Sequence, residues 1–229
     1  MNFNILYEDE DIIVCYKPTG VSVQTSKLGE QDMVSLLKNH LKGGYVAVIH
    51  RLDQPVEGVL VFAKTPFAAK ELSKGLQGAG FGKYYKAILW GIPKEDSKIL
   101  EDYLVKDGRT NTSRACSANE KDAKKAVLHY EVLEKGKDGD KDICLVKVKL
   151  ETGRHHQIRV QMANMGCPIW GDAKYNTMAM QDRRFRQIAL CAYRLEFVHP
   201  KTKKRMEFEI QPKGEGFNLF NLDKNRNFQ

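Results

Sequence analysis

The sequence has few cysteines, and none in an arrangement that would cross-link the chain. Its five cysteines are scattered, odd in number and form no Cys-x-x-Cys pair. Disulfide frameworks and zinc ribbons both rest on evenly paired or closely spaced cysteines. The pattern argues against both and indicates thiols that stay reduced, which predicts a cytoplasmic location.

Long hydrophobic runs are missing as well. No apolar run approaches the ~18 residues that a membrane-spanning helix needs. The N-terminus is acidic and has neither the basic region nor the apolar segment of a signal peptide. Internal repeats, low-complexity tracts and nucleotide-binding motifs are also absent. These absences predict a soluble protein with no membrane partner.

What is present is ordinary for a globular protein, apart from its charge. The 229 residues are 42% hydrophobic and 29% charged, enough for one large domain or two small ones with an ample core. The formal net charge is +8 and the isoelectric point is near 9.1. Such basicity favours polyanionic partners, either nucleic acid or an anionic membrane surface.

Residues 50–65 are the stretch around which the candidate chemistry is organised. Asp53 closely follows Arg51, a turn at Gln54–Pro55 comes next, and the apolar run Val59–Ala63 is short enough for a buried strand. A carboxylate held beside a rigid strand and near an arginine can be kept ionised for chemistry. The alternative interpretation is a charged turn that only leads into a core strand.

Hydrophobic periodicity and turn residues predict both strands and helices. Hairpins are predicted over residues 4–16, 126–150 and 188–211, and single strands over 45–49 and 80–91. Helices are predicted over 31–41, from Pro66 onward, and from His156 to a stop at Gly166. Arg159 lies beside the apolar face of the last helix, where burial would require a carboxylate partner.

Residues 93–125 are rich in charge and poor in apolar side chains. This composition predicts a solvated, mobile excursion from the fold. In a nucleic-acid-binding protein, Arg109 and Arg114 of this segment would contact phosphates. An ordinary exposed loop is the alternative.

His155 and His156 could suggest a metal site together with His50 and Asp53. Adjacent histidines, however, point to different sides of any regular element, and no pair of histidines has the i, i+4 spacing of a helical metal site. The sequence therefore predicts no metal site.

Five ordered blocks of the sequence carry a family resemblance. They are Lys17–Gly20 after an acidic turn, His50–Asp53 with Gly58 and a strand ending in Ala63-Lys64, Lys83-x-Tyr85-x-Ala87, Thr152–Val160 with Cys167–Asp172, and Leu190–Ala192 with His199-Pro200. Together they resemble the motifs of the RluA-type RNA pseudouridine synthases, from about residue 6 to residue 212.

The resemblance is incomplete at three places. Val56 and Glu57 stand where the family usually has Thr-Ser, Cys191 replaces a common histidine, and Gln161 replaces another. None of these positions falls on the family's aspartate, tyrosine or paired arginine. The departures therefore bear on the choice of substrate more than on activity.

The fold implied by the resemblance is α+β. It has a mixed, largely antiparallel sheet flanked by helices and loops, with a central catalytic cleft. A single catalytic domain over residues 1–229 is expected, without a separate S4 domain, because the opening motif begins within the first ten or so residues. The tail over residues 213–229 is predicted to fray, with Phe217, Leu219 and Phe220 as residues able to dock.

The reaction implied by the resemblance is conversion of uridine to pseudouridine in ribosomal or transfer RNA, on a base flipped out of the RNA. Asp53 falls on the catalytic aspartate and Arg159 on the arginine that pairs with it. Tyr85 would stack on the base and is a candidate for removing the C5 proton, and Leu190 would line the pocket beneath the uracil. An isomerisation needs no cofactor or metal.

The RNA partner is expected to be held by arginines. Arg51 would fill the gap left by the flipped base, and Arg109, Arg114 and Arg154 complete the predicted RNA-binding set. The protein is expected to be a monomer. Whether Asp53 attacks the sugar, attacks the base or removes the 2′ proton stays open.

Two other classes of protein fit part of the pattern. A non-catalytic RNA-binding module would explain the charge and the basic segment, but would not require an aspartate beside a distant arginine. A glycosidase that uses Asp53 and Glu57 as a carboxylate pair would explain glycosidic chemistry. It would lack an aromatic sugar platform, since the only tryptophans are Trp90 and Trp170.

Overall fold

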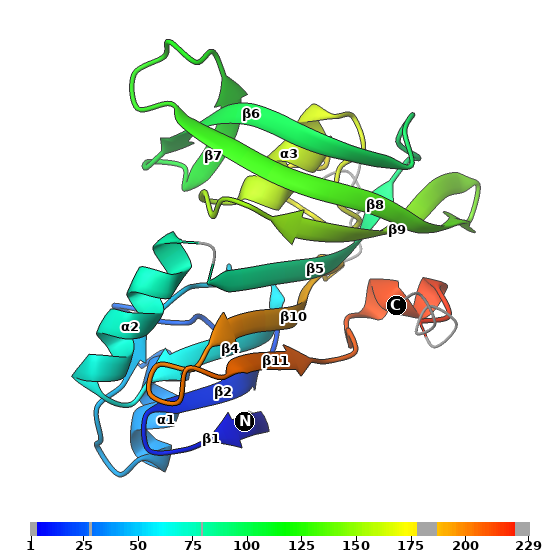
Figure 1. Cartoon of the computed structure of the whole chain (residues 1–229). Coiled ribbons are helices and arrows are strands. Elements are labelled where there is room, and N and C mark those ends of the chain that lie inside the picture. Colours follow the sequence, from blue (N-terminus) through cyan, green and yellow to red (C-terminus); the bar gives the residue numbers. More distant parts are fainter. Residues whose placement is uncertain (1–3, 28, 79, 178–186, 223–229) are drawn as a thin grey trace. The chain divides into compact units, whose positions relative to one another are not determined.

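The computed structural model describes residues 4–27, 29–78, 80–177 and 187–222. The contacts between residues divide the chain into two compact units (Figure 1). Unit 1 comprises Met1–Lys83 and Ala192–Pro212, and unit 2 comprises Tyr84–Cys191 and Lys213–Gln229. The sequence predicts one domain for the whole chain, whereas the contacts between residues fall into these two sets.

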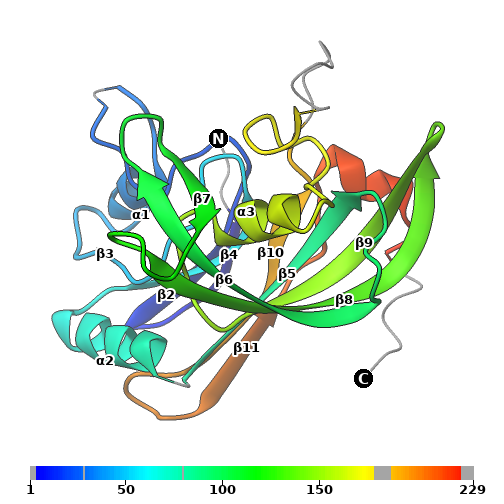
Figure 2. The ribbon, with the colours of Figure 1, turned by 90° about the horizontal axis from the view of Figure 1, so that it is seen from above.

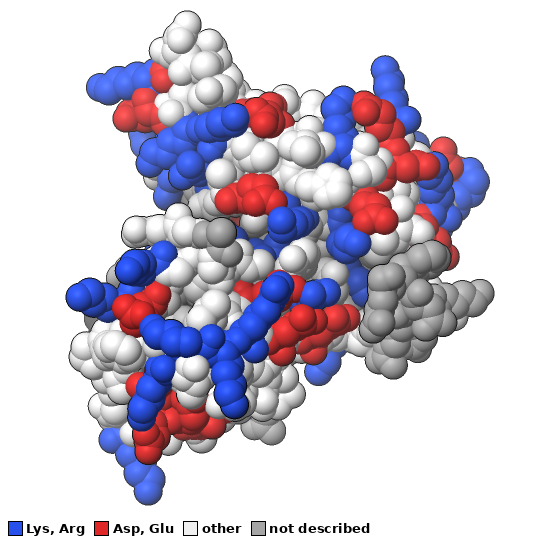
Figure 3. Space-filling view, in the orientation of Figure 1, with Lys and Arg blue, Asp and Glu red and all other residues white. Residues whose placement is uncertain are grey.

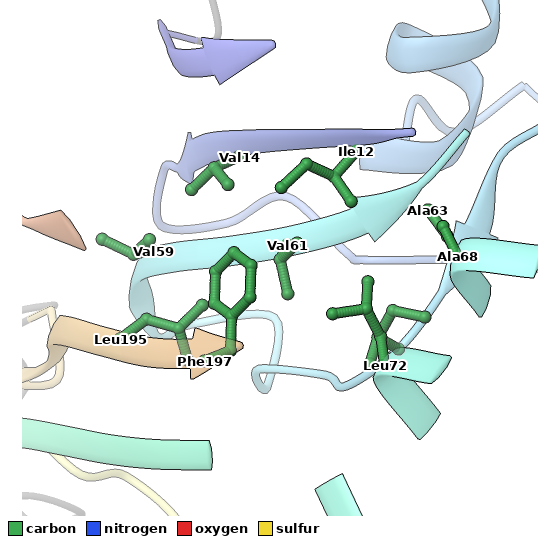
Figure 4. Packing of buried hydrophobic residues seen from close by; sticks show 10 residues of the cluster. Ile12, Val14, Val59, Val61, Ala63, Ala68, Leu72, Leu195 and Phe197 are labelled. Carbon is green, nitrogen blue, oxygen red and sulfur yellow. The ribbon is translucent and has the colours of Figure 1, made fainter. Parts of the chain in front are cut away.

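Unit 1 is built on a sheet in the order β1-β2-β4-β10, with β11 paired to β10 and β3 paired to β4. The strands are β1 (Asn4–Glu8), β2 (Ile12–Lys17), β3 (Ala47–Val48), β4 (Glu57–Ala63), β10 (Leu190–Val198, of which Ala192–Val198 belong to this unit) and β11 (Arg205–Glu209). β2 pairs antiparallel with β4 and β10 with β11. Figure 4 shows β4 and β10 pointing the same way, so the sheet is mixed.

Two capped helices accompany this sheet. In α1 (Met33–His40) the Asp32 carboxylate accepts a hydrogen bond from the Ser35 backbone N–H at 2.7 Å, and the Ser35 hydroxyl accepts one from the Asp32 backbone N–H at 3.1 Å. α2 (Pro66–Gln77) begins with Pro66 in its first turn and the Thr65 hydroxyl as its cap. The core between α2 and the strands holds ten buried residues: Ile12, Val14, Ile49, Val59, Val61, Ala63, Ala68, Leu72, Leu195 and Phe197 (Figure 4).

Unit 2 is a second, antiparallel arrangement in the order β5-β9-β8-β6-β7. The strands are β5 (Phe81–Trp90, of which Tyr84–Trp90 belong to this unit), β6 (Ser97–Asp107), β7 (Thr112–Cys116), β8 (Lys124–Asp138) and β9 (Lys141–Leu150). α3 (Gln157–Asn164) packs beside β6 and β7 through a cluster of Leu104, Ala126 and Val160 (Figure 2). The predicted α+β class is confirmed, as are the predicted hairpins and helices.

The prediction of a mobile excursion over residues 93–125 is wrong for much of its length. β6 and β7 form a registered hairpin in which Leu104 pairs with Ala115, and β6 also pairs along β8. The segment lacks apolar residues because only one face of β6 is covered. Leu104 is buried against α3, whereas Ile99 and Glu101 are exposed.

The tail was expected to fray from residue 213 on, but the part that the structure describes is ordered. Residues Glu215–Leu219 form a 3-10 helix, η1, in which Phe217 is buried, and Phe220 follows it into the core. Leu219 is exposed. Residues 223–229 lie outside the described part of the chain. Within the described ranges, no helix has both the length and the apolar character to cross a membrane.

One glycine of β4 is required by both its conformation and its surroundings. Gly58 has φ +148°, and a Cβ there would lie 2.5 Å from the Ala192 Cβ and 2.6 Å from the Ala192 carbonyl oxygen. We expect Gly58→Ala to lower the free energy of unfolding by roughly 2–5 kcal/mol, because overpacking and backbone strain add. Urea denaturation measures the loss.

Gly108→Ala is the matched control for this substitution. Gly108 lies in the β6–β7 turn, has an ordinary φ and has open space around it. It should change the free energy of unfolding by well under ~1 kcal/mol. Equal losses for the two alanine variants would contradict this account of Gly58.

Candidate active site

Asp53 sits in a turn that a second turn holds in place. Asp53 is half-buried and precedes β4. The backbone N–H of Gly20 donates to the Gln54 carbonyl at 2.9 Å, and the Gln54 side-chain amide donates back to the Gly20 carbonyl at 3.1 Å. The Thr19 hydroxyl donates to the Pro55 carbonyl at 2.8 Å. These three bonds join segments more than thirty residues apart and fix the backbone that carries Asp53.

A buried lysine lies under this turn. The Lys17 side chain is completely buried, and its Nζ donates to the carbonyls of Pro18 at 2.9 Å and Gln54 at 3.0 Å. Burial lowers the pKa of Lys17 to about 7, while the charges of Asp53 and Glu57 act in the opposite direction.

Glu57 is the second carboxylate near Lys17. The sequence places it in the turn after Asp53, but it is the first residue of β4 and is almost completely buried. The Tyr16 hydroxyl donates to its Oε2 at 2.5 Å. Glu57 therefore fills, with a hydrogen-bonded carboxylate, a position where the resembling family usually has a small hydroxyl residue.

His50 has a packing role in the structure. The Val61 backbone N–H points to its Nε2 at 3.4 Å, and its ring meets the Phe81 ring edge-on at 6.1 Å. Burial, helped by the charge of Lys83, lowers the pKa of His50 to about 3. His50 is therefore a neutral hydrogen-bond acceptor at physiological pH.

In unit 2, Arg159 is buried and forms a two-point ion pair. Its Nε donates to Asp172 Oδ2 at 2.8 Å and its Nη2 to Asp172 Oδ1 at 2.6 Å, and neither side chain is exposed beyond 5%. The predicted burial of Arg159 is confirmed. Asp172 is a partner of Arg159 that the sequence analysis does not single out. The only available signal was its place in the Gly171-Asp172 motif that follows the helix.

Arg159 also lies under an aromatic ring. Its Cζ is 5.1 Å from the centre of the Tyr175 ring, and the Tyr175 hydroxyl lies 2.7 Å from His156 Nδ1. The Ser113 backbone N–H donates to the same hydroxyl at 2.8 Å. Asp172 and Tyr175 thus fix the guanidinium from two directions.

The paired histidines have hydrogen-bond partners inside unit 2. His155 Nδ1 lies 2.8 Å from the Ser113 hydroxyl and its Nε2 lies 3.2 Å from Asn111 Oδ1. His156 has the left-handed φ of 53° just before α3, and its ring stacks on that of His155. Among the described residues, no cluster of three or more His, Cys, Asp or Glu side chains is arranged to hold a metal ion.

The remaining predicted site residues lie on strand ends and surfaces. Tyr85 is buried on β5, and Leu190 is buried at the start of β10, both in unit 2. Arg51 is exposed beside the Asp53 turn, and Arg109 is exposed at the β6–β7 turn. The pairing of Asp53 with Arg159, expected from the family resemblance, joins residues of different units and stays a prediction.

Two of the predicted RNA-binding arginines bond to other groups on the protein surface. The Arg114 guanidinium pairs with the Glu120 carboxylate through both of its terminal nitrogens. Arg154 is exposed, but its Nε donates to the Lys125 carbonyl at 2.8 Å. Among the described residues, Arg51, Arg109 and Arg154 form no salt bridge, and of these three only the Arg154 guanidinium has the backbone hydrogen bond just described.

We expect Asp172→Asn to destabilise the protein by about 3–5 kcal/mol, because it leaves the buried Arg159 charge without its carboxylate. Urea denaturation measures the change, and Arg159→Met combined with Asp172→Asn should lose less than the sum of the two single variants. Glu120→Gln is the control, because it removes the same two-point partner from the exposed Arg114 and should leave the midpoint nearly unchanged. Equal effects of the two carboxylate substitutions would contradict the account.

Comparison with known proteins places this chain in a family. The profile of the family described as RNA pseudouridylate synthase matches residues 11–164, which include Asp53, Tyr85 and Arg159. An uncharacterised RNA pseudouridine synthase of Aquifex aeolicus is 34% identical over 222 residues, covering 91% of this chain and 69% of that protein. Ribosomal large subunit pseudouridine synthase D of Pseudomonas aeruginosa is 35% identical over 226 residues, covering 91% and 68%.

Other relatives match a larger share of their own length. The tRNA pseudouridine synthase C of Vibrio parahaemolyticus is 31% identical over 221 residues, covering 90% of this chain and 89% of that protein. Among solved structures, human RNA pseudouridylate synthase domain containing 1 has a TM-score of 0.78 at 24% identity, covering 92% of this chain and 84% of that one. Human RNA pseudouridylate synthase domain containing 4 has a TM-score of 0.74 at 22% identity, which likewise shows a shared fold. The resemblance to RluA-type enzymes is confirmed, and the chain belongs to the RNA pseudouridylate synthase family.

Proposed function

We propose that this protein isomerises specific uridines of ribosomal or transfer RNA to pseudouridine, with Asp53 as the catalytic carboxylate. The observation that carries the proposal is the Asp53 turn, locked by the Lys17–Gly20 turn over a buried ammonium. Relatives named for ribosomal RNA and for transfer RNA are about equally similar, so both substrate classes are proposed.

The reaction breaks the N1–C1′ bond, turns the uracil and joins C5 to C1′. C5 loses a proton and N1 carries one in the product, so atoms and electrons balance without an external reactant. An ionised Asp53 can serve as nucleophile toward C1′, as nucleophile toward the ring, or as the base that removes the 2′ proton. All three roles require a carboxylate held in a fixed place, and the turn that carries Asp53 is held by the Lys17 Nζ bond to the Gln54 carbonyl.

Arg159 is the proposed partner that orients Asp53 when RNA is bound. Asp172 takes two of the five N–H donors of the guanidinium. The other N–H donors belong to the same Arg159 guanidinium, whose plane and position Asp172 already fixes. Less entropy is therefore lost when the guanidinium binds a second carboxylate. Tyr85 is proposed to stack on the flipped uracil and to take up the C5 proton, with Leu190 beneath the base.

RNA binding is proposed to rest first on Arg51 and Arg109, because Arg114 and Arg154 already bond to other groups of the protein surface. Arg51 would fill the space left by the flipped base, and Arg109 would contact phosphate. Arg114 and Arg154 would first have to leave Glu120 and the Lys125 carbonyl. A cytoplasmic location, where thiols stay free, accords with the five free cysteines, and the protein is proposed to act as a monomer.

The burial of Glu57 argues against a glycosidase. A hydrolytic carboxylate pair must flank the bond that is cut or hold a water beside it. Glu57 is almost completely buried and bonded to Tyr16, so its carboxylate has little access to solvent water. A non-catalytic RNA-binding module would have no use for a buried ammonium beside Asp53.

Asp53→Asn keeps the size and hydrogen-bonding reach of the side chain but removes its charge. We expect turnover to vanish, while RNA affinity changes little because binding rests on the basic surface. The measurement is tritium release from RNA labelled with 5-[³H]uridine, because chemistry at C5 liberates that label. Appreciable turnover by the asparagine variant would contradict the role of Asp53.

Glu57→Gln distinguishes this proposal from a carboxylate-pair mechanism. If Asp53 acts alone, the folded glutamine variant should keep most of its turnover. A loss of activity as complete as that of Asp53→Asn would favour paired carboxylates instead.

Tritium release should also survive exhaustive chelation, because each proposed step uses only side chains and the substrate. Treatment with EDTA followed by desalting tests this directly. Activity lost on chelation and restored by zinc would overturn the proposed chemistry.

A further inference from the structure

A hollow of about 290 Å³ lies in unit 1, between α2, the first residue of β5 and the turn that joins β10 to β11. Its lining includes the apolar residues Leu72, Phe81 and Val198 and the glycines at 75, 78 and 80. Val198 is 44% exposed. The hollow is therefore open to a partner.

The hollow lies at the far end of the sheet from Asp53. In the β2–β4 pairing, Lys17 faces Gly58 beside the Asp53 turn, while Ile12 faces Ala63 at the other end. His199, which lines the hollow, lies beside that other end, because its Nε2 is 2.8 Å from the Asp9 carboxylate. Five residues of strand correspond to about 17 Å. The hollow is thus separate from the proposed catalytic centre.

The β10–β11 turn is rigid before any partner arrives. His199 is buried, and its Nδ1 accepts hydrogen bonds from the backbone N–H groups of Lys201 at 3.2 Å and Thr202 at 3.0 Å. Two acceptor contacts at Nδ1 place the ring proton on Nε2, facing Asp9. The His199 N–H donates to the Lys204 carbonyl at 2.8 Å and closes the turn. The turn therefore presents its lysines from a fixed backbone.

Positive charge exceeds negative charge around the hollow. Lys203 pairs with Glu71 at 2.5 Å and lies 6.0 Å from the Phe67 ring, and Lys201 pairs with Glu10. Lys74 lines the hollow, and Lys70 and Lys204 lie on the same helix and the same turn; none of the three forms an ion pair within the described part of the chain. Figure 3 shows Lys and Arg side chains gathered over the region where Figure 1 places the β10–β11 turn.

We infer that this basic hollow, formed by α2 and the β10–β11 turn, binds the sugar–phosphate backbone of the RNA at a distance from the flipped uridine. Unpaired lysines near an open hollow suit phosphates, because binding that neutralises a phosphate releases its counterions and is strengthened by that release. The apolar floor suits a ribose or an unstacked base. The strand from Gly58 to Ala63 alone spans about 17 Å, the length of about five stacked nucleotides at 3.4 Å each. The inference rests on the proposed function for the identity of the RNA.

The test is a triple variant with Lys70→Gln, Lys74→Gln and Lys204→Gln. Its affinity is measured by fluorescence anisotropy from 50 to 300 mM salt, on an unmodified transfer RNA or ribosomal RNA transcript that supports tritium release by the wild type. We expect affinity to fall by about tenfold or more and the salt slope to decrease by about 2 to 3, because each lost phosphate contact removes ~0.7–0.9 from the slope. Turnover at saturating RNA should stay unchanged, since Asp53 is untouched.

The matched control removes the same charge elsewhere. Lys98, Lys135 and Lys147 lie on the strands of unit 2 in exposed ion pairs with Glu95, Asp96 and Glu131. Their triple glutamine variant should leave affinity and salt slope nearly as in the wild type. Equal losses in both variants would reduce the effect to net charge and overturn the inference. An unchanged salt slope in the first variant would do the same and would point to a partner other than RNA.

The outcome separates this inference from the proposed function. If the wild type binds the transcripts with the expected loss in the triple variant but releases no tritium from any of them, the binding surface stands and the catalytic proposal fails. If tritium release is normal and the triple variant binds as the wild type does, the catalytic proposal stands and the basic hollow is not an RNA site.

Discussion

A cation buried in a protein must be satisfied, because a charge removed from water costs several kcal/mol when it has no partner. Each unit of this protein is organised around one such cation. In unit 1, Lys17 is satisfied by two backbone carbonyls and by the nearby charges of Asp53 and Glu57. In unit 2, Arg159 is satisfied by Asp172.

These two groups also explain why the candidate residues are held rigidly within each unit. Lys17 can be satisfied only if the turns at residues 17–20 and 53–56 stay together, so its burial and the position of Asp53 depend on one another. Arg159 likewise ties α3 to the loop that carries Asp172 and Tyr175. Groups held in this way need little reorganisation when charge develops in a reaction, which is the main requirement for electrostatic catalysis.

The sequence was informative where local chemistry decides the structure. Pro66 after Thr65 predicts the start of α2, and the turn before Val59–Ala63 predicts the buried β4. β6 and β7 were missed because a strand covered on one face has too few apolar residues to stand out. The Arg159–Asp172 pair and the burial of Lys17 were missed for another reason: both depend on which distant segments meet, and spacing along the chain does not contain that information.

The central claim is that this chain rearranges a glycosidic bond within RNA without releasing the base. The most direct measurement is nucleoside analysis of an unmodified ribosomal or transfer RNA transcript after incubation with the purified protein. The account predicts that each uridine lost appears as one pseudouridine, with no free uracil and no change in the mass of the RNA. Release of free uracil, or transcripts of both classes that keep all their uridine, would contradict it.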